Sequence, residues 1–136
     1  MGSMEYVIGV LLALAVAGLA ATIFRRERAF YPIVAIVVAS YYVLFAAMDG
    51  SGRTVIAESV AAAGFLVLAL IGFRRNMWLV AVALAGHGVL DFFHHYLVTN
   101  PGVPSWWPGF CLAFDVVAGI ACAWQLMRAS HSVVSA

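Results

Sequence analysis

Five long apolar runs, separated by short polar breaks, organise this chain. Each run is close to the length of about 20 residues that an α-helix needs to cross the hydrocarbon core of a membrane. The predicted spans are residues 4–24, 31–48, 54–73, 77–98 and 110–127. The breaks contain charged residues, or the glycine and proline that end helices. The pattern predicts an all-α membrane protein, a five-helix transmembrane bundle. We expect residues 1–136 to form this single domain, with residues 1–3 a cloning remnant.

Composition agrees with a lipid environment. Hydrophobic residues make up 65% of the chain and charged residues 10%, whereas soluble domains have roughly half and a quarter. A soluble domain of this length has too small a core to bury so many apolar side chains. The net charge is +1 and no basic stripe is present, so we expect membrane lipid, and no nucleic acid, as its partner.

The basic residues are distributed unequally between the two sides of the predicted bundle. One side carries Arg25, Arg26, Arg28, Arg74, Arg75 and Arg128. The other side carries Arg53. Because basic residues are retained on the cytoplasmic side of membranes, we expect the N-terminus outside and the C-terminus in the cytoplasm.

Small residues recur every four positions along the first span. They are Gly9, Ala13, Ala17 and Ala21. Such a stripe lets another helix approach closely. Packing inside the bundle is the favoured interpretation, and a homodimer through small-residue faces is the alternative.

Ionisable side chains inside the spans are the main functional signal, because each costs roughly 2.5–3.5 kcal/mol at the membrane centre. There are six: Glu58, His87, Asp91, His94, His95 and Asp115. The predicted orientation places all of them in the outer half of the membrane. At about 100° per residue, His87, Asp91 and His94 fall within an arc of about 60°. We expect a buried polar site beneath the loop that contains Trp106 and Trp107.

Imidazole and carboxylate groups are ligands of Zn, Fe and Mn, and helix bundles build such sites from facing helices. The candidate metal ligands are His87, Asp91, His94, His95 and Asp115. The candidate catalytic residues are Glu58, Asp91 and Asp115, since a free carboxylate can act as base towards a metal-bound water. The chain is therefore expected to bind a divalent transition metal, and to support a metal-dependent hydrolytic or redox reaction on a lipid-like substrate.

Several alternatives remain at this stage. The chain can be a proton- or cation-coupled transporter or channel, or a non-catalytic subunit or assembly factor of a membrane complex. Interhelical hydrogen bonding alone can explain the polar cluster. His95 can extend to the membrane interface, and Glu58 can be a solvated carboxylate at a helix start. Cys111 and Cys122 suit the core, because about 16 Å of helical rise separates them.

The segment Asp91-Phe92-Phe93-His94-His95 resembles one His-x-x-His-His box of membrane di-iron hydroxylases and desaturases, with Asp in place of the first His. Those enzymes need three boxes, so the chain does not belong with them. Residues 87–95 and 104–115 are similar to a family of small uncharacterised multi-pass membrane proteins of bacteria. Its pattern is a His-x-x-x-Asp-x-x-His-His helix, then a Trp/Pro loop and a Cys-x-x-x-Asp helix. The resemblance implies a bacterial cytoplasmic membrane and residues that act together, but no activity.

Overall fold

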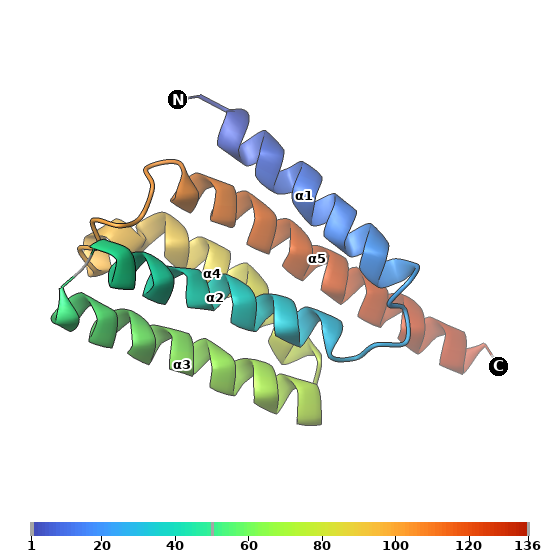
Figure 1. Ribbon diagram of the computed structural model, residues 1–136. Coiled ribbons are helices and arrows are strands. Elements are labelled where there is room, and N and C mark those ends of the chain that lie inside the picture. The colour runs from blue at the N-terminus through green and yellow to red at the C-terminus, as the bar shows by residue number, and fades with distance from the viewer. Residues whose placement is uncertain (1, 50, 136) are drawn as a thin grey trace.

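The computed structural model describes residues 2–49 and 51–135. These residues form five α-helices and no strand. The helices are α1 (Met4–Ala21), α2 (Phe30–Asp49), α3 (Gly52–Arg75), α4 (Trp78–Leu97) and α5 (Trp107–Val134). Figure 1 shows them lying along one another in an elongated bundle. The predicted all-α, five-helix fold is confirmed.

The largest difference from the predicted spans lies in α5. This helix begins at Trp107 and not at residue 110, because Pro108 is compatible with the first helical turn, where its missing N–H is not needed. Trp107 is therefore a buried helical residue and not part of the preceding loop. The helix also continues to Val134, beyond the predicted end at residue 127, since no glycine or proline interrupts its polar last turns.

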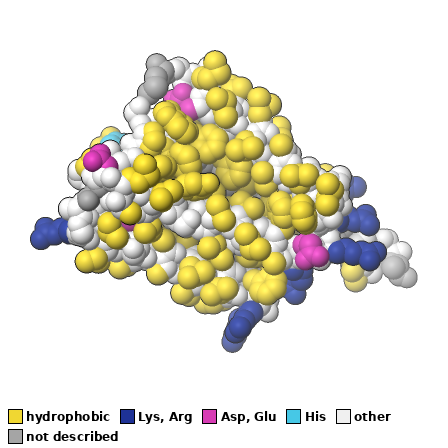
Figure 2. All heavy atoms as spheres, in the orientation of Figure 1, with side chains coloured by type: hydrophobic (Ala, Val, Ile, Leu, Met, Phe, Trp, Pro, Cys, Tyr) yellow, Lys and Arg dark blue, Asp and Glu magenta, His cyan; other side chains and the backbone are white. Residues whose placement is uncertain are grey.

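The helices are suited to a membrane. Among the described residues, α1, α2, α3 and α5 are each long and apolar enough to cross one. α4, which carries three histidines and Asp91, is not among these four. Large apolar side chains such as Leu11, Val60 and Ile120 are more than half exposed, and Figure 2 shows hydrophobic side chains covering much of the visible surface. These features are those of an integral membrane protein.

α5 lies between α1 and α4, while α2 packs against α3 and both of these helices contact α4. Glycines allow the closest approaches. A Cβ atom on Gly9 would lie 2.6 Å from the Phe110 carbonyl oxygen, and one on Gly119 would lie 2.9 Å from the Ala81 carbonyl oxygen. Gly9 and Ala13 are both buried. At least this part of the small-residue stripe of α1 is thus used inside the chain, against α5.

The two ends of the bundle differ. One end holds the α2–α3 turn, the loop of residues 98–106 and the start of α1 (Figure 1); we call it the loop end. The opposite end holds the α1–α2 and α3–α4 connections and the last turns of α5, and we call it the arginine end. It carries six of the seven arginines, with only Arg53 at the loop end. The unequal distribution of basic residues expected from the sequence is therefore present in the fold.

Candidate metal centre

Five of the six ionisable side chains in the predicted spans are buried. They are Glu58, His87, Asp91, His94 and Asp115. His95 is exposed, and its ring lies 3.8 Å from the ring of Tyr96, measured between centroids. The structure thus keeps His95 apart from the other five side chains.

His87, Asp91 and Asp115 form one compact group. The His87 ring N–H donates to Asp115, with Nδ1 and Oδ2 2.7 Å apart, and the same Nδ1 lies 3.3 Å from Asp91 Oδ2. One ligand atom from each of the three residues lies within 4.8 Å of the other two. Asp91 and Asp115 are 1% and 0% exposed. We call these three residues the inner cluster.

Gly88 brings the inner cluster together. A Cβ atom at this position would lie 2.9 Å from the Asp115 Cβ atom and 3.2 Å from the carbonyl oxygens of Cys111 and Leu112. Because Gly88 has no side chain, α4 and α5 approach closely enough for Asp115 to reach His87. The site therefore depends on Gly88, which lets α4 and α5 come close enough for their ionisable side chains to meet.

Several polar atoms in and beside the inner cluster lack hydrogen bonds. They are Asp91 Oδ2, Asp115 Oδ1 and Tyr42 Oη, all inaccessible to solvent. Tyr42 lies close to Asp91. Buried oxygens without partners are costly, and a buried carboxylate without a proton, a donor or a cation is costlier still. The group is therefore arranged to accept a proton or a positive ion.

The distances suit a metal ion. Two ligand atoms that each lie about 2.1 Å from an ion are about 3.0–3.4 Å apart in octahedral or tetrahedral geometry. The separation between His87 and Asp91 falls in this range. The His87–Asp115 separation is a few tenths of an ångström shorter because a proton joins the two atoms. Loss of that proton, which metal binding to imidazole requires, frees the nitrogen for an ion.

A small cavity adjoins the inner cluster. Its volume is about 20 Å³, and its walls include Tyr42, Glu58, Phe65, His87 and Asp91. A water molecule needs roughly 10–15 Å³ measured in this way. The cavity therefore has room for one water molecule or one ion, but not for an organic substrate.

His94 and Glu58 form a second group, nearer the loop end. His94 Nε2 donates to Glu58 Oε1 over 2.8 Å, and the Asn100 amide donates to the same oxygen over 2.8 Å and to the Tyr42 carbonyl oxygen over 3.1 Å. The Tyr42 ring lies on that of His94, with centroids 4.1 Å apart. Glu58 is consequently buried and hydrogen-bonded, and is not the solvated helix-start carboxylate considered from the sequence.

Depth separates the two groups. His87 and His94 are seven residues apart, about 10 Å along the helix. They share the buried face of α4, but a single ion cannot contact both. His87 faces Asp115 on α5, and His94 faces Glu58 on α3. The shared polar face of α4 expected from the sequence is confirmed. Its residues, however, pair with two different helices, α5 at His87 and α3 at His94.

A larger hollow opens at the loop end. Its volume is about 400 Å³, and it is lined by residues of the end of α4 and of the following loop, including His94, His95, Asn100 and Ser105. We call this hollow the vestibule. His94 lines both the vestibule and the small cavity that adjoins the inner cluster. Among the residues that line these two hollows, His94 is the one common to both.

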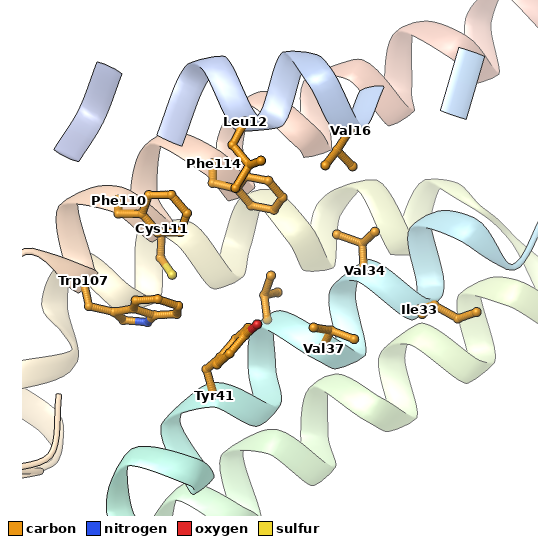
Figure 3. A pocket seen from close by; sticks show the side chains of 11 residues that line it. Leu12, Val16, Ile33, Val34, Val37, Tyr41, Trp107, Phe110, Cys111 and Phe114 are labelled. Carbon is orange, nitrogen blue, oxygen red and sulfur yellow. The ribbon is translucent and has the colours of Figure 1, made fainter. Parts of the chain in front are cut away.

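An apolar groove of about 360 Å³ lies between α1, α2 and α5. Figure 3 shows Leu12, Val16, Val37 and Phe114 among the side chains around it. Cys111 lines this groove, and its thiol lies close to the Asp91 carboxyl group. One buried side chain thus lies between the groove and the inner cluster.

Beyond His87, towards the arginine end, the core is apolar. Leu84, Val80 and Ala118 are each fully buried there. Within residues 2–49 and 51–135, the next buried polar contact in that direction is the hydrogen bond from Gln125 to the Tyr31 hydroxyl, 2.8 Å long. Among the described residues, the buried ionisable side chains therefore occupy only the half of the bundle nearer the loop end.

Asn100 and Tyr42 contribute to the site but were not among the sequence candidates. Asn100 follows α4 in an irregular loop, where periodicity carries no information. Tyr42 lies in an apolar run, and only its adjacency to Tyr41 marks it as unusual.

Comparison of the chain with protein-family models, with curated proteins and with solved structures finds no match. The resemblance of residues 87–95 and 104–115 to small bacterial membrane proteins accordingly assigns neither a family nor an activity. What characterises this chain is its own geometry: an all-α fold, four of whose helices are long and apolar enough to cross a membrane, with a buried His-Asp-Asp group that could hold a metal ion.

Proposed function

We propose that this chain is an integral membrane protein that binds one divalent transition metal ion, Zn, Fe or Mn, through His87, Asp91 and Asp115. One observation carries the proposal: three ligand atoms converge within 4.8 Å in a fully buried place, beside carboxylate oxygens that have no hydrogen bond. A metal ion would satisfy these oxygens, for which the interhelical hydrogen bonds supply no partner.

Charge supports the same conclusion. Two ionised carboxylates beside one neutral imidazole leave two negative charges inside the bundle, where lipid cannot solvate them. A divalent cation balances both. One nitrogen and two carboxylate oxygens form a mixed donor set, suited to Zn, Fe and Mn more than to Cu(I), which prefers thiolates, or to Ca, which prefers oxygen alone.

The ion reaches the inner cluster from the loop end. His94 lines both the vestibule and the small cavity, and its ring is held there by the hydrogen bond to Glu58. Rotation of His94 about its side-chain bonds opens this route without movement of a helix. Glu58 offers an oxygen ligand along the route.

Elemental analysis of the purified full chain tests the proposal. The protein is prepared in detergent without chelators, and emptied protein is reloaded separately with Zn, Fe(II) and Mn(II). Asp115→Asn and His87→Ala remove ligands, while His95→Ala changes an exposed histidine next to the site. We expect about one ion per chain in the wild type and in His95→Ala, and none in the two ligand variants.

Circular dichroism confirms that each variant keeps its helices, so that loss of metal is not confused with loss of fold. X-ray absorption of the loaded protein should show nitrogen and oxygen neighbours and no sulfur, because Cys111 is not among the ligands. A wild-type protein that retains no metal under any of these conditions refutes the proposal.

A reaction on a lipid-like substrate is the chemistry that the apolar groove favours. The groove can hold a hydrocarbon chain, and Cys111, which lines it, also lies close to Asp91. A metal ion held by His87, Asp91 and Asp115 would acidify a bound water, and Glu58, which is outside this ligand set, would act as base through His94 and pass protons towards the vestibule. Loaded protein incubated with extracted membrane lipids should alter a lipid species detected by mass spectrometry, and Asp91→Asn protein should not.

Transport of a cation or a proton is the second candidate, favoured by the vestibule and by the His94–Glu58 pair beneath it. The apolar core from Leu84 onwards opposes it, since an ion would find no ligand there. A flux assay in liposomes distinguishes the two: uptake that depends on Glu58 supports transport, and turnover of lipid without uptake supports catalysis.

For the orientation, we propose that the loop end faces outwards and the arginine end faces the cytoplasm of a bacterial cytoplasmic membrane. The six arginines at one end support this assignment. A reporter enzyme that is active only in the cytoplasm, fused after the last residue, should be active. Fusion before the first residue should leave it inactive.

A further inference from the structure

Another hollow lies at the arginine end, away from the inner cluster. Its volume is about 520 Å³, and it lies between the last turn of α1 and the last turns of α5. Its walls include Ala21, Arg25, Trp124, Gln125 and Arg128. Two arginines from separate parts of the chain thus face one hollow.

These arginines have no acidic partners in the part of the chain that the structure describes, where every ion pair involves a histidine. The Arg128 guanidinium lies over the Trp124 ring, 4.8 Å from its centroid, which holds it beside the hollow. Arg25 also lines an adjoining hollow of about 300 Å³, together with Arg28 and Glu27. Glu27 is the single carboxylate among the six arginines of this end, so the local charge is strongly positive.

The floor of the hollow is fixed by hydrogen bonds. The Gln125 side-chain amide donates to the Tyr31 hydroxyl over 2.8 Å and to the Ala17 carbonyl oxygen over 3.3 Å. These bonds join α5 to α2 and α1. The positions of Arg25 and Arg128 relative to each other are therefore set by the packed bundle and not by a loop alone.

The surroundings of the hollow are apolar and exposed. Ile23 and Phe24 follow α1 and are 73% and 40% exposed, and Met127 on α5 is 44% exposed. Guanidinium groups bind phosphate oxygens in a bidentate manner, and exposed apolar side chains beside them suit acyl chains. A ligand that satisfies both features has an anionic head and a hydrocarbon tail.

We propose that this hollow binds the phosphate of an anionic phospholipid, held by Arg25 and Arg128, with the acyl chains over Ile23, Phe24 and Met127. Basic pockets between membrane helices on the cytoplasmic side recognise such head groups. The lipid joins the end of α1 to the end of α5. This site is independent of the metal site, since no residue is shared.

Binding of defined lipids to the full chain, measured by native mass spectrometry in detergent, tests the proposal. The probes are phosphatidylglycerol and phosphatidylcholine with identical acyl chains. The variants are Arg25→Gln and Arg128→Gln, and the matched control is Arg53→Gln at the loop end. All three arginines are exposed, so we expect the circular dichroism of every variant to match that of the wild type.

We expect phosphatidylglycerol to bind at least about ten-fold more tightly than phosphatidylcholine, from two arginines that each contribute about five-fold. Arg25→Gln and Arg128→Gln should each weaken phosphatidylglycerol binding about five-fold, and Arg53→Gln should leave it unchanged. Equal loss in all three variants overturns the proposal, because it indicates a general effect of net charge. Inorganic phosphate that binds as tightly as phosphatidylglycerol also overturns it, since the acyl chains would then contribute nothing and the site would take a free anion.

Discussion

Substitution of Gly88 by alanine perturbs the inner cluster without changing any ionisable group. The added Cβ atom would lie 2.9 Å from the Asp115 Cβ atom and 3.2 Å from two carbonyl oxygens of α5. None of these atoms is the end of a flexible side chain. The helices α4 and α5 must therefore move apart, and Asp115 moves away from His87.

The size of the movement follows from these distances. Carbon atoms in ordinary contact are about 3.5–4.0 Å apart, so the helices separate by about 0.6–1 Å. The bond from His87 to Asp115, now 2.7 Å long, lengthens beyond the limit of about 3.2 Å for a good hydrogen bond. Overpacking costs about 1–3 kcal/mol, and loss of a hydrogen bond to a charged group costs about 1.5–3 kcal/mol.

Gly86 provides the matched control. It lies on the same helix two residues earlier, and a Cβ atom there would meet no other atom within 4 Å. Both substitutions gain the same helix propensity, about 1 kcal/mol, so this gain cancels in the comparison. We expect the metal-free Gly88→Ala protein to have a free energy of unfolding about 2.5–6 kcal/mol lower than that of Gly86→Ala.

Equilibrium unfolding by SDS in mixed micelles, followed by circular dichroism, gives the two free energies. Metal affinity, measured by competition with a chelator, should fall at least about ten-fold in Gly88→Ala and stay unchanged in Gly86→Ala. If the two variants match each other in stability and in affinity, close approach of α4 and α5 at Gly88 does not hold the inner cluster together.

Three further predictions concern neighbouring side chains. Glu58→Gln should lower the free energy of unfolding by about 1–3 kcal/mol, because the charge-assisted bond from His94 is lost; unfolding in mixed micelles measures it, and an unchanged value contradicts the pairing. Tyr42→Phe should leave metal-free stability unchanged or higher, since the hydroxyl has no hydrogen bond; a large loss in the same assay shows that the hydroxyl is bonded. Cys111 and Cys122 are free and buried, so maleimide should label neither in the folded protein and both in SDS; rapid labelling in mild detergent contradicts their burial.

Much of this architecture follows from the sequence because the determining signals are local. A run of about 20 apolar residues ended by charge defines a membrane helix without reference to any other part of the chain. The buried face of α4 follows equally well, since helical periodicity places His87, Asp91 and His94 on one side. The helix bounds confirm the five helices, four of which are long and apolar enough to cross a membrane, and the burial of these residues confirms the shared face.

The pairing of side chains between helices did not follow in the same way. Periodicity within α4 says nothing of which neighbour its polar face meets at each depth, and this depends on glycine contacts such as that of Gly88 with α5. Yet the spacing of His87 and His94, about 10 Å of rise, already argues against a shared ion. The role of Asn100 could not be predicted from the sequence, because its contacts depend on the path of a loop.

The position of the inner cluster part-way along the bundle links ion binding to the membrane potential. Asp91 lies six residues before the end of α4 at Leu97, so about 9 Å of a helix of about 30 Å separates it from the loop end. A divalent ion arriving from that side crosses about a third of the electric field. At about 2.3 kcal/mol for each charge and each 100 mV, this contributes about 1.4 kcal/mol, or about ten-fold in affinity. With the loop end outside, an energised membrane would therefore raise the affinity of the site for the ion, and depolarisation would lower it again.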